Sequence, residues 1–200
     1  MKSIPSWINV RSLLLVVALL VADIATAQSG AWLDQPLSAW NQPGAPVPTA
    51  PAPKGDPPTD PRCAGGVRQA ATPEERMVTS AGWSLYAKPT ARGNATVVLG
   101  EASVDGMCRP WDYQAFVFVK GSFAGTLSPS FMDSRTDGAL SEIRFASPIA
   151  IEVVFLRYVD ADPLCCPSRL TAVRYRIQRR GQGPVVVPIS ARSKSTAGSG

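Results

Sequence analysis

The chain has 200 residues, 19 prolines and no histidine, and its 20 basic side chains exceed its 15 acidic ones. Without histidine, the sequence excludes a Ser-His or Cys-His nucleophile, an imidazole general base and a zinc site with nitrogen ligands. The formal charge of +5 is a small excess for a chain of this length, so it gives no indication of nucleic-acid binding.

The first 27 residues have the organisation of an export signal. A basic start at Lys2 and Arg11 precedes an apolar run over residues 12–21, and the small residues Ala25 and Ala27 occupy the two subsites of a cleavage site. The run is about half as long as a spanning helix requires, so we expect cleavage after Ala27 and no stable membrane span. The sequence therefore predicts a periplasmic or secreted bacterial protein.

Composition divides the rest of the chain into three parts. Residues 28–61 contain nine prolines, which lack the amide donor and fix φ, so we predict a disordered, extended linker with Trp32 and Trp40 exposed or loosely packed. Residues 62–188 are long enough for one hydrophobic core and are predicted to form one domain. Residues 189–200 are rich in Ser, Ala, Gly, Lys and Arg, which predicts a disordered basic tail.

The elements of residues 62–188 are predicted in chain order. Thr72 and Pro73, followed by Glu74 and Glu75, are typical of a helix start, and Gly82 ends the pattern after two or three turns. Apolar or alternating runs then predict strands at residues 96–99, 114–119, 123–127, 140–145, 149–159, 170–177 and 184–188.

The apolar pattern of each run predicts where its strand lies in the sheet. The run at 114–119 is apolar on both faces, which predicts a central strand, and the long run at 149–159 is predicted to lie in the middle of a sheet. Residues 170–177 alternate between apolar and polar, and prolines bound the edge strand at 184–188. The predicted fold class is α+β, mostly β: a single antiparallel-sheet domain with one short N-terminal helix, braced by disulfides.

Four cysteines, at positions 63, 108, 165 and 166, are an even number in an exported chain and predict two disulfides. A bond between Cys165 and Cys166 closes a strained eight-membered ring. We therefore favour the two pairings in which Cys165 and Cys166 each join Cys63 or Cys108. Adjacent cysteines also chelate one tetrahedral ion poorly, so we expect a structural role and no metal site.

Five residues are candidates to face a ligand: Trp111, Tyr113, Ser134, Arg135 and Asp137. The two aromatic rings follow Cys108 where a loop would present them to a glycan or peptide, although core packing accounts for them equally well. The other three lie in the polar loop 132–138. Its carboxylates, Asp133 and Asp137, have the composition of an acid and base pair, but we favour turn residues that bond to their own backbone.

Several blocks of the sequence resemble the LppP/LprE family of bacterial cell-envelope proteins. The likeness covers roughly residues 82–177 and is carried by the blocks 108–110, 115–129, 134–138 and 162–168. The resemblance implies an envelope protein without an assigned reaction or catalytic residues. Members of the family are typically lipoproteins, and this chain departs from them because no lipid-accepting cysteine lies near Ala27.

We therefore expect a non-enzymatic envelope protein that binds a cell-wall polymer or another envelope protein, without cofactor or catalytic residues. The alternative is an extracytoplasmic enzyme. It would be a thiol-disulfide exchanger at Cys165 and Cys166, where Arg169 is the nearby cation, or a hydrolase that uses Asp133 and Asp137.

Overall fold

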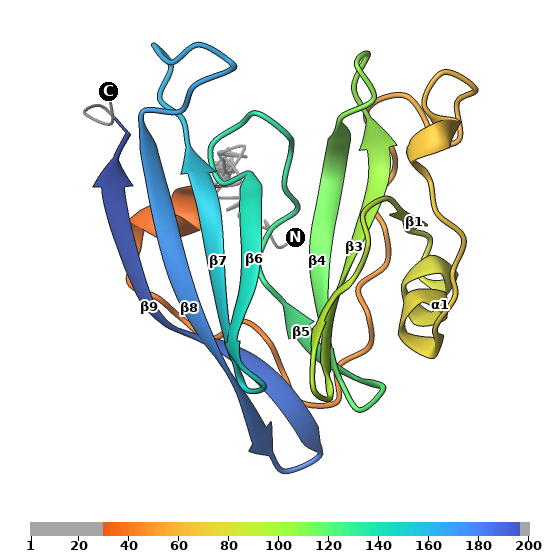
Figure 1. The fold of residues 1–200 in the computed structure, drawn as a ribbon, viewed down its shortest axis with the longest axis vertical. Coiled ribbons are helices and arrows are strands. Elements are labelled where there is room, and N and C mark those ends of the chain that lie inside the picture. Colours follow the sequence, from red (N-terminus) through yellow and green to blue (C-terminus); the bar gives the residue numbers. More distant parts are fainter. Residues whose placement is uncertain (1–29, 197–200) are drawn as a thin grey trace, which may run out of the picture.

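Nine strands and one α-helix form in the computed structural model, which describes residues 30–196. The first antiparallel sheet contains β1 (Ser84–Leu85), β2 (Thr90–Arg92), β3 (Ala95–Val104), β4 (Pro110–Val119) and β5 (Ser122–Thr126). The second is a meander of β6 (Leu140–Ser147), β7 (Ala150–Arg157), β8 (Arg169–Arg180) and β9 (Gly183–Ser195). Figure 1 shows the two sheets side by side, with the helix on the outside of the first.

The main hydrophobic core lies between the two sheets. On β4, Tyr113, Ala115 and Val117 face the second sheet, where they join Val153 of β7 and Tyr175 of β8 in one buried cluster. The other face of the first sheet buries a second cluster, which contains Phe116, Phe118, Trp83 and Val78. Strand β4 is therefore covered on both faces, which confirms the prediction of a central strand at 114–119.

The predicted fold class, mostly β with one short helix, is confirmed. The strands divide between two sheets because residues 127–139 carry the chain across from β5 to β6. Within this connection, Met132 pairs with Tyr113 of β4 before the chain enters the second sheet. The predicted mid-sheet strand at 149–159 is β7, which lies between β6 and β8.

The predicted helix start is also confirmed. Helix α1 (Pro73–Ser80) has Thr72 as its N-cap and Pro73 in its first turn, and the Thr72 hydroxyl accepts a hydrogen bond from the Glu75 amide at 3.2 Å. The Glu75 carboxylate accepts in return from the Thr72 amide, which completes a capping box. A salt bridge from Arg68 to this carboxylate, at 2.8 Å, ties the helix to the segment before it.

The predicted disordered linker is wrong for the described part of residues 28–61. Residues 30–62, called the strap below, run over the domain and are fastened to it by polar contacts. The Ala50 amide donates to the Ala81 carbonyl at 2.9 Å, the Trp83 indole donates to the Pro48 carbonyl at 2.7 Å, and Asp56 pairs with Val104. Proline prevents this segment from forming a ladder, but an extended chain with accepting carbonyls still docks on a folded surface.

Two tryptophans and an asparagine hold the strap where the sheets meet. Trp32 and Trp40 pack against the main core, which corrects the prediction of loosely packed rings. The Asn41 amide nitrogen donates to the Thr126 carbonyl of β5 at 2.9 Å and to the Val186 carbonyl of β9 at 3.0 Å. This one side chain therefore links the edge strands of the two sheets.

Gly125 makes room for that link. It has a φ of 124°, and a side chain there would lie 2.2 Å from the Asn41 side chain. Only glycine adopts this conformation without strain, so the backbone of β5 approaches Asn41 at a position where other residues would clash.

The termini differ from expectation in one respect. The tail predicted to be disordered from residue 189 continues strand β9 as far as Ser195, because residues 190–195 pair with β8. The predicted signal peptide, residues 1–27, and the last four residues lie outside the described range. Among residues 30–196, no helix has the length and apolar character needed to span a bilayer.

Replacing Trp40 tests whether the strap belongs to the folding unit. We expect Trp40→Ala to lower the free energy of unfolding by about 2 to 4 kcal/mol, because it removes a partly buried ring from the core. Urea denaturation measures the change. Met107→Ala, at a side chain that is 74% exposed, should change it by less than about 0.5 kcal/mol. Equal effects of the two substitutions would show that the strap contributes nothing to stability.

Candidate functional site

A cleft lies where hairpin ends of both sheets meet the strap. Its volume is about 940 Å³, at the upper end of the range typical of ligand sites. Six segments line it: strap residues 44–47, Met77 of α1, and the turn regions 93–94, 119–123, 148–149 and 177–184. The strap closes one side of this cleft, called the hairpin cleft below.

The turn between β4 and β5 builds one wall. Lys120 and Gly121 connect the two strands and have φ values of 50° and 78°, as the tight two-residue turns of hairpins require. The Lys120 amide donates to the Asn94 carbonyl at 2.8 Å, which fixes this turn against the neighbouring one. The turn thereby presents the Lys120 side chain, which is exposed, beside the cleft.

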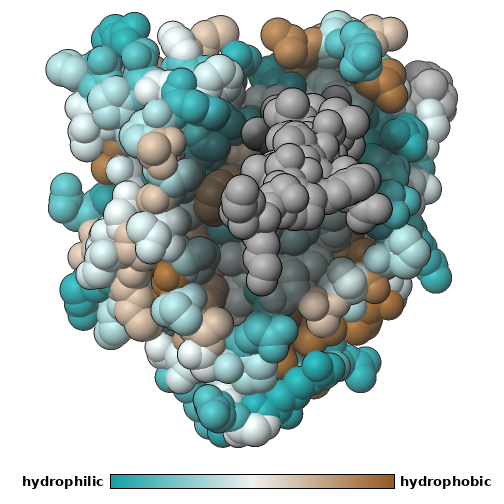
Figure 2. Space-filling model, turned by 180° about the vertical axis from the view of Figure 1, so that it is seen from behind, coloured by the Kyte–Doolittle hydropathy of each residue, from teal (hydrophilic) through white to brown (hydrophobic). Residues whose placement is uncertain are grey.

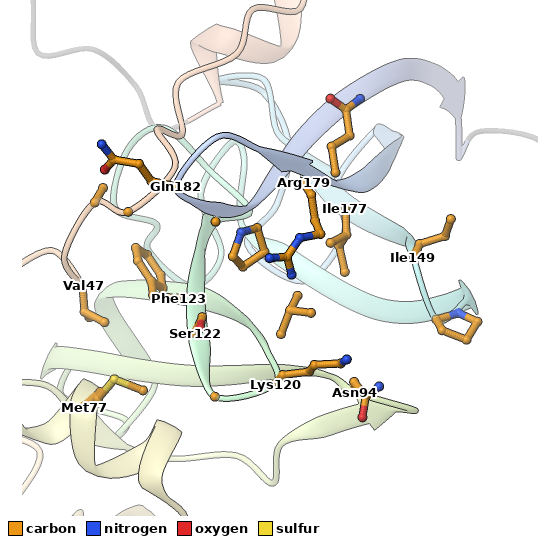
Figure 3. A pocket seen from close by; sticks show the side chains of 18 of the residues that line it. Val47, Met77, Asn94, Lys120, Ser122, Phe123, Ile149, Ile177, Arg179 and Gln182 are labelled. Carbon is orange, nitrogen blue, oxygen red and sulfur yellow. The ribbon is translucent and has the colours of Figure 1, made fainter.

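The lining combines apolar surface with positive charge. Its apolar side chains include Val47, Met77, Val119, Phe123, Ile149 and Ile177. Its charged side chains are Lys120 and Arg179, and no carboxylate is among the lining residues. Figure 3 shows Arg179 reaching from β8 toward the turn that carries Lys120, so the two cations approach the cleft from different sheets.

Polar groups also surround the open end of the cleft. In the view from behind, hydrophilic side chains cover the tip of the β8–β9 hairpin at the lower end of the molecule (Figure 2). This tip contains the exposed residues Arg180, Gly181 and Gln182. The cleft thus has apolar walls inside and a polar rim, an arrangement typical of sites for amphiphilic molecules.

Sequence reasoning missed the hairpin cleft because its residues come from six separate segments. The available signal was weak: each turn contains glycine or a cationic side chain, but nothing in the chain order places the turns of the two sheets together. The strap, taken to be disordered, supplies four of the lining residues.

The structure brings three of the five predicted ligand-facing residues together. Tyr113, Ser134 and Arg135 line a second cavity of about 300 Å³, which also contacts Arg109, Tyr158 and Cys165. Tyr113 is only 3% exposed, and its hydroxyl accepts a hydrogen bond from the Leu140 amide at 2.6 Å. Burial raises the pKa of this hydroxyl, so it remains neutral in the cavity wall.

The other two predicted residues lie elsewhere. The Trp111 ring lies beneath Lys54 of the strap, whose ammonium group is 5.8 Å from the ring centre. Asp137 accepts from the guanidinium Nε of Arg157 at 2.8 Å and from the Tyr158 amide at 3.0 Å. Both side chains are therefore engaged in contacts within the protein.

The carboxylates of Asp133 and Asp137 bind different groups within the protein. Asp133 accepts from Lys54 at 2.7 Å and from the Asp112 amide at 2.8 Å. Burial alone would lower the pKa of Lys54, but hydrogen bonds to Asp133 and Asp112 raise it. Asp137 pairs instead with Arg157, which is 1% exposed and also contacts Asp34 of the strap. These partners support the interpretation of Asp133 and Asp137 as structural residues.

The disulfide pairing differs from the two pairings favoured by sequence. Cys63 bonds to Cys108, with their Cα atoms 5.2 Å apart, and Cys165 bonds to its neighbour Cys166. The reason is the route of the strap: Asp56 pairs with Val104 at the end of β3, which leads Cys63 to the turn that carries Cys108. Cys165 and Cys166 lie in the separate loop between β7 and β8.

The two disulfides should contribute unequally to stability. The Cys63–Cys108 bond spans 45 residues, so the chain-entropy model predicts that Cys63→Ala/Cys108→Ala costs about 4 kcal/mol. The vicinal bond closes no loop of chain, and Cys165→Ala/Cys166→Ala should cost about 1 kcal/mol or less. Urea denaturation of both double variants measures these costs, and an equal loss would contradict the assignment of Cys63–Cys108 as the main covalent brace.

Glu101 is the buried carboxyl group with the most altered acidity among those described. It lies on β3 opposite Tyr113, is 3% exposed, and burial raises its pKa to about 7. Burial also raises the pKa of the neighbouring Tyr86, and the charges of Tyr113 and Glu101 raise it further by a smaller amount. Near neutral pH the folded protein therefore holds a proton that an exposed glutamate would lose.

This proton makes stability depend on pH. The contribution of Glu101 is fully present below pH 4.5, the ordinary pKa, and is lost as pH rises through the folded pKa of about 7. Glu101→Gln stays neutral, so we expect its free energy of unfolding relative to wild type to rise by about 2 to 3 kcal/mol between pH 5 and pH 8. Urea denaturation at both pH values tests this. The control is Glu142→Gln at an exposed position, which should change the free energy of unfolding by the same amount at pH 5 and at pH 8. A parallel shift for Glu101→Gln would show that its carboxyl titrates normally.

Two facing antiparallel sheets with disulfide bonds define a small β domain of the kind found outside the reducing cytoplasm. Residues 88–180, which extend from just before β2 to the end of β8, match the family model of the LppP/LprE lipoproteins. This match confirms the resemblance found in the sequence. The family indicates an envelope-associated protein.

No curated protein and no solved structure matches the chain. The strap, α1, β1 and β9 lie outside the matched residues, whereas Lys120 and Arg179 of the hairpin cleft lie inside them.

Proposed function

We propose that this protein is a non-enzymatic binding module of the cell envelope, and that the hairpin cleft holds an anionic amphiphile. The observation that carries the proposal is the composition of the cleft: apolar walls, two cationic side chains and no lining carboxylate. A molecule with an alkyl chain and an anionic headgroup complements both features. Envelope components of this chemistry include lipids and lipid-linked wall polymers.

The apolar walls provide the first part of the recognition. Met77 and Val47 approach from the side of the helix and strap, and Ile149 and Ile177 come from the second sheet. Ile149 is 56% exposed, so an alkyl chain against it would bury apolar surface that now faces water. Each buried methylene group contributes about 0.8 kcal/mol, so full burial of a ten-carbon chain would contribute about 8 kcal/mol before the entropic cost of association.

Lys120 and Arg179 provide the second part. Both side chains are exposed, and they extend from β turns and strands that the core holds in place. Arginine offers a planar set of donors suited to phosphate or carboxylate, and lysine adds a mobile point charge. Two cations at a cleft without acidic lining residues favour an anionic headgroup over a neutral one.

The arrangement of the loop carboxylates supports a binding role over hydrolysis. Asp133 bonds to a lysine and an amide, and Asp137 bonds to a buried arginine and an amide. A general base must have a free lone pair directed at a substrate, and these partners direct the two carboxylates into the protein.

A calorimetric titration tests the proposal with decyl phosphate as the anionic probe and decyl maltoside as the neutral probe, both below their micelle concentrations. We expect wild-type protein to bind decyl phosphate more tightly. Lys120→Ser/Arg179→Ser should weaken that binding at least about tenfold, because two charge-assisted contacts are lost. The binding of decyl maltoside should be unchanged.

The matched control is Arg192→Ser/Lys194→Ser, which removes two exposed cations from β9 outside the cleft. It should leave both affinities at the wild-type value. An equal loss in both double variants would mean that the probe responds to net charge alone. Absence of binding to wild-type protein would overturn the proposal.

A further inference from the structure

The vicinal disulfide lies in an exposed loop beside the second cavity. Cys165 is exposed and lines that cavity, and Leu164 before it is 64% exposed. Cys166 is exposed as well, whereas in the other disulfide Cys108 is exposed and Cys63 is 8% exposed. Exchange with an external thiol requires access to a sulfur atom, so the vicinal bond offers two exposed cysteines to attack and the Cys63–Cys108 bond offers one.

The loop keeps its ends in place without the disulfide. One carboxylate oxygen of Asp162 accepts from the Val159 amide at 3.0 Å and from the Ser168 amide at 2.8 Å, which joins the two flanks of the loop. The Thr196 hydroxyl donates to the Pro167 carbonyl at 2.6 Å and fastens the loop to the end of β9. Opening the bond between Cys165 and Cys166 therefore leaves the strands β7 and β8 paired and the domain folded.

The cavity places positive charge next to the disulfide. Arg135 donates to the Leu164 carbonyl at 2.9 Å, and the Tyr158 hydroxyl donates to the same carbonyl at 3.2 Å. This carbonyl is neutral, so the contact positions the guanidinium group without offsetting its charge. Arg135 has a φ of 61°, an uncommon conformation for a residue other than glycine, which sets the direction of its side chain.

The other charged side chain that lines the cavity is already paired. Arg109 also lines the cavity and pairs with Asp105 at 2.6 Å, so its charge is largely balanced. No carboxylate is among the residues that line the cavity. Sequence reasoning identified only Arg169 as a nearby cation, because Arg135 is distant in the chain and reaches the loop through the fold.

We propose that Cys165–Cys166 is a reversible thiol-disulfide exchange site for an anionic dithiol that approaches through this cavity. A thiolate of the dithiol attacks one sulfur, forms a mixed disulfide and releases the other cysteine as a thiolate, which takes up a proton. The second thiol of the dithiol, as a thiolate, then attacks the dithiol's own sulfur in the mixed disulfide. This step releases the second cysteine as a thiolate, which takes up a proton, and leaves the dithiol as an intramolecular disulfide. Two electrons and two protons pass to Cys165 and Cys166, and the dithiol is oxidised.

Arg135 acts here as a positioning residue. Its charge attracts the incoming thiolate and stabilises the thiolate that leaves, because the guanidinium group is bonded to the Leu164 carbonyl, next to Cys165 in the chain. The two cavities share no lining residue, so the exchange is independent of the ligand proposed for the hairpin cleft.

The test compares two reducing agents on the full chain. Dimercaptopropanesulfonate is an anionic dithiol and dithiothreitol is a neutral one, and each rate constant is expressed per thiolate present. Released thiols are alkylated at timed intervals, and peptide mapping assigns them to cysteine positions. We expect Cys165 and Cys166 to be labelled at least about tenfold faster than Cys63 and Cys108, with circular dichroism unchanged.

The charge of Arg135 gives the decisive comparison. In wild-type protein we expect the anionic dithiol to react about threefold or more faster than the neutral one at low salt, and the ratio to approach one at high salt. Arg135→Gln should bring the ratio toward one at low salt, and Arg135→Lys should retain it. Arg192→Gln, an exposed cation on β9, should leave it unchanged.

Two results would overturn the inference. Simultaneous reduction of both disulfides, or reduction of Cys165–Cys166 only with loss of the folded circular dichroism spectrum, would show that the vicinal bond is part of the structural brace. A ratio that is the same in wild type and Arg135→Gln would show that the cavity does not select the dithiol by charge.

Discussion

The Asn41 side chain makes the hydrogen bonds on which the arrangement of the two sheets depends. Its amide contacts the Thr126 and Val186 carbonyls, on the facing edges of β5 and β9, and its carbonyl accepts from the Thr126 amide at 2.9 Å. Among the described residues no ladder of hydrogen bonds joins β5 to β9, so side chains supply the polar links between the sheets. Besides the bonds of Asn41, the Leu140 amide of β6 donates to the Tyr113 hydroxyl of β4, and Arg92 of β2 donates to the Phe145 carbonyl of β6. The strap that carries Asn41 also forms one wall of the hairpin cleft, so the same segment holds the sheets and shapes the candidate site.

Charged residues are used in two distinct ways. Inside the protein they are paired, as with the guanidinium group of Arg157 between Asp137 and Asp34. Burial alone would lower the pKa of Arg157, and hydrogen bonds to these two carboxylates raise it, so the cation stays charged. At the hairpin cleft, Lys120 and Arg179 face open space instead. An uncompensated cation is costly in a core but inexpensive at a wet cleft, where it is available to a ligand.

Local chemistry was predictable from sequence and long-range placement was not. The capping residues Thr72 and Glu75 fixed the start of α1, and the alternation of residues 170–177 fixed β8, because each signal depends on neighbours in the chain. The polar loop 132–138 was identified as a candidate site, and Ser134 and Arg135 do line a cavity. Cys165 lines the same cavity, but sequence reasoning paired it with Cys63 or Cys108 and not with Cys166. The route of the strap past β3 determined the pairing, and composition alone predicted that segment to be a disordered, extended linker.

By itself, the sequence determined the strand content, the helix, the absence of histidine chemistry and the likeness to an envelope family, since periodicity, capping and composition act over short distances. The tertiary structure alone decided which cysteines pair, that the proline-rich strap packs into the interface, and that six separate segments converge on one cleft. These features depend on contacts between residues far apart in the chain. Such contacts follow from how two sheets and a strap pack together, and no local pattern of residues specifies that packing.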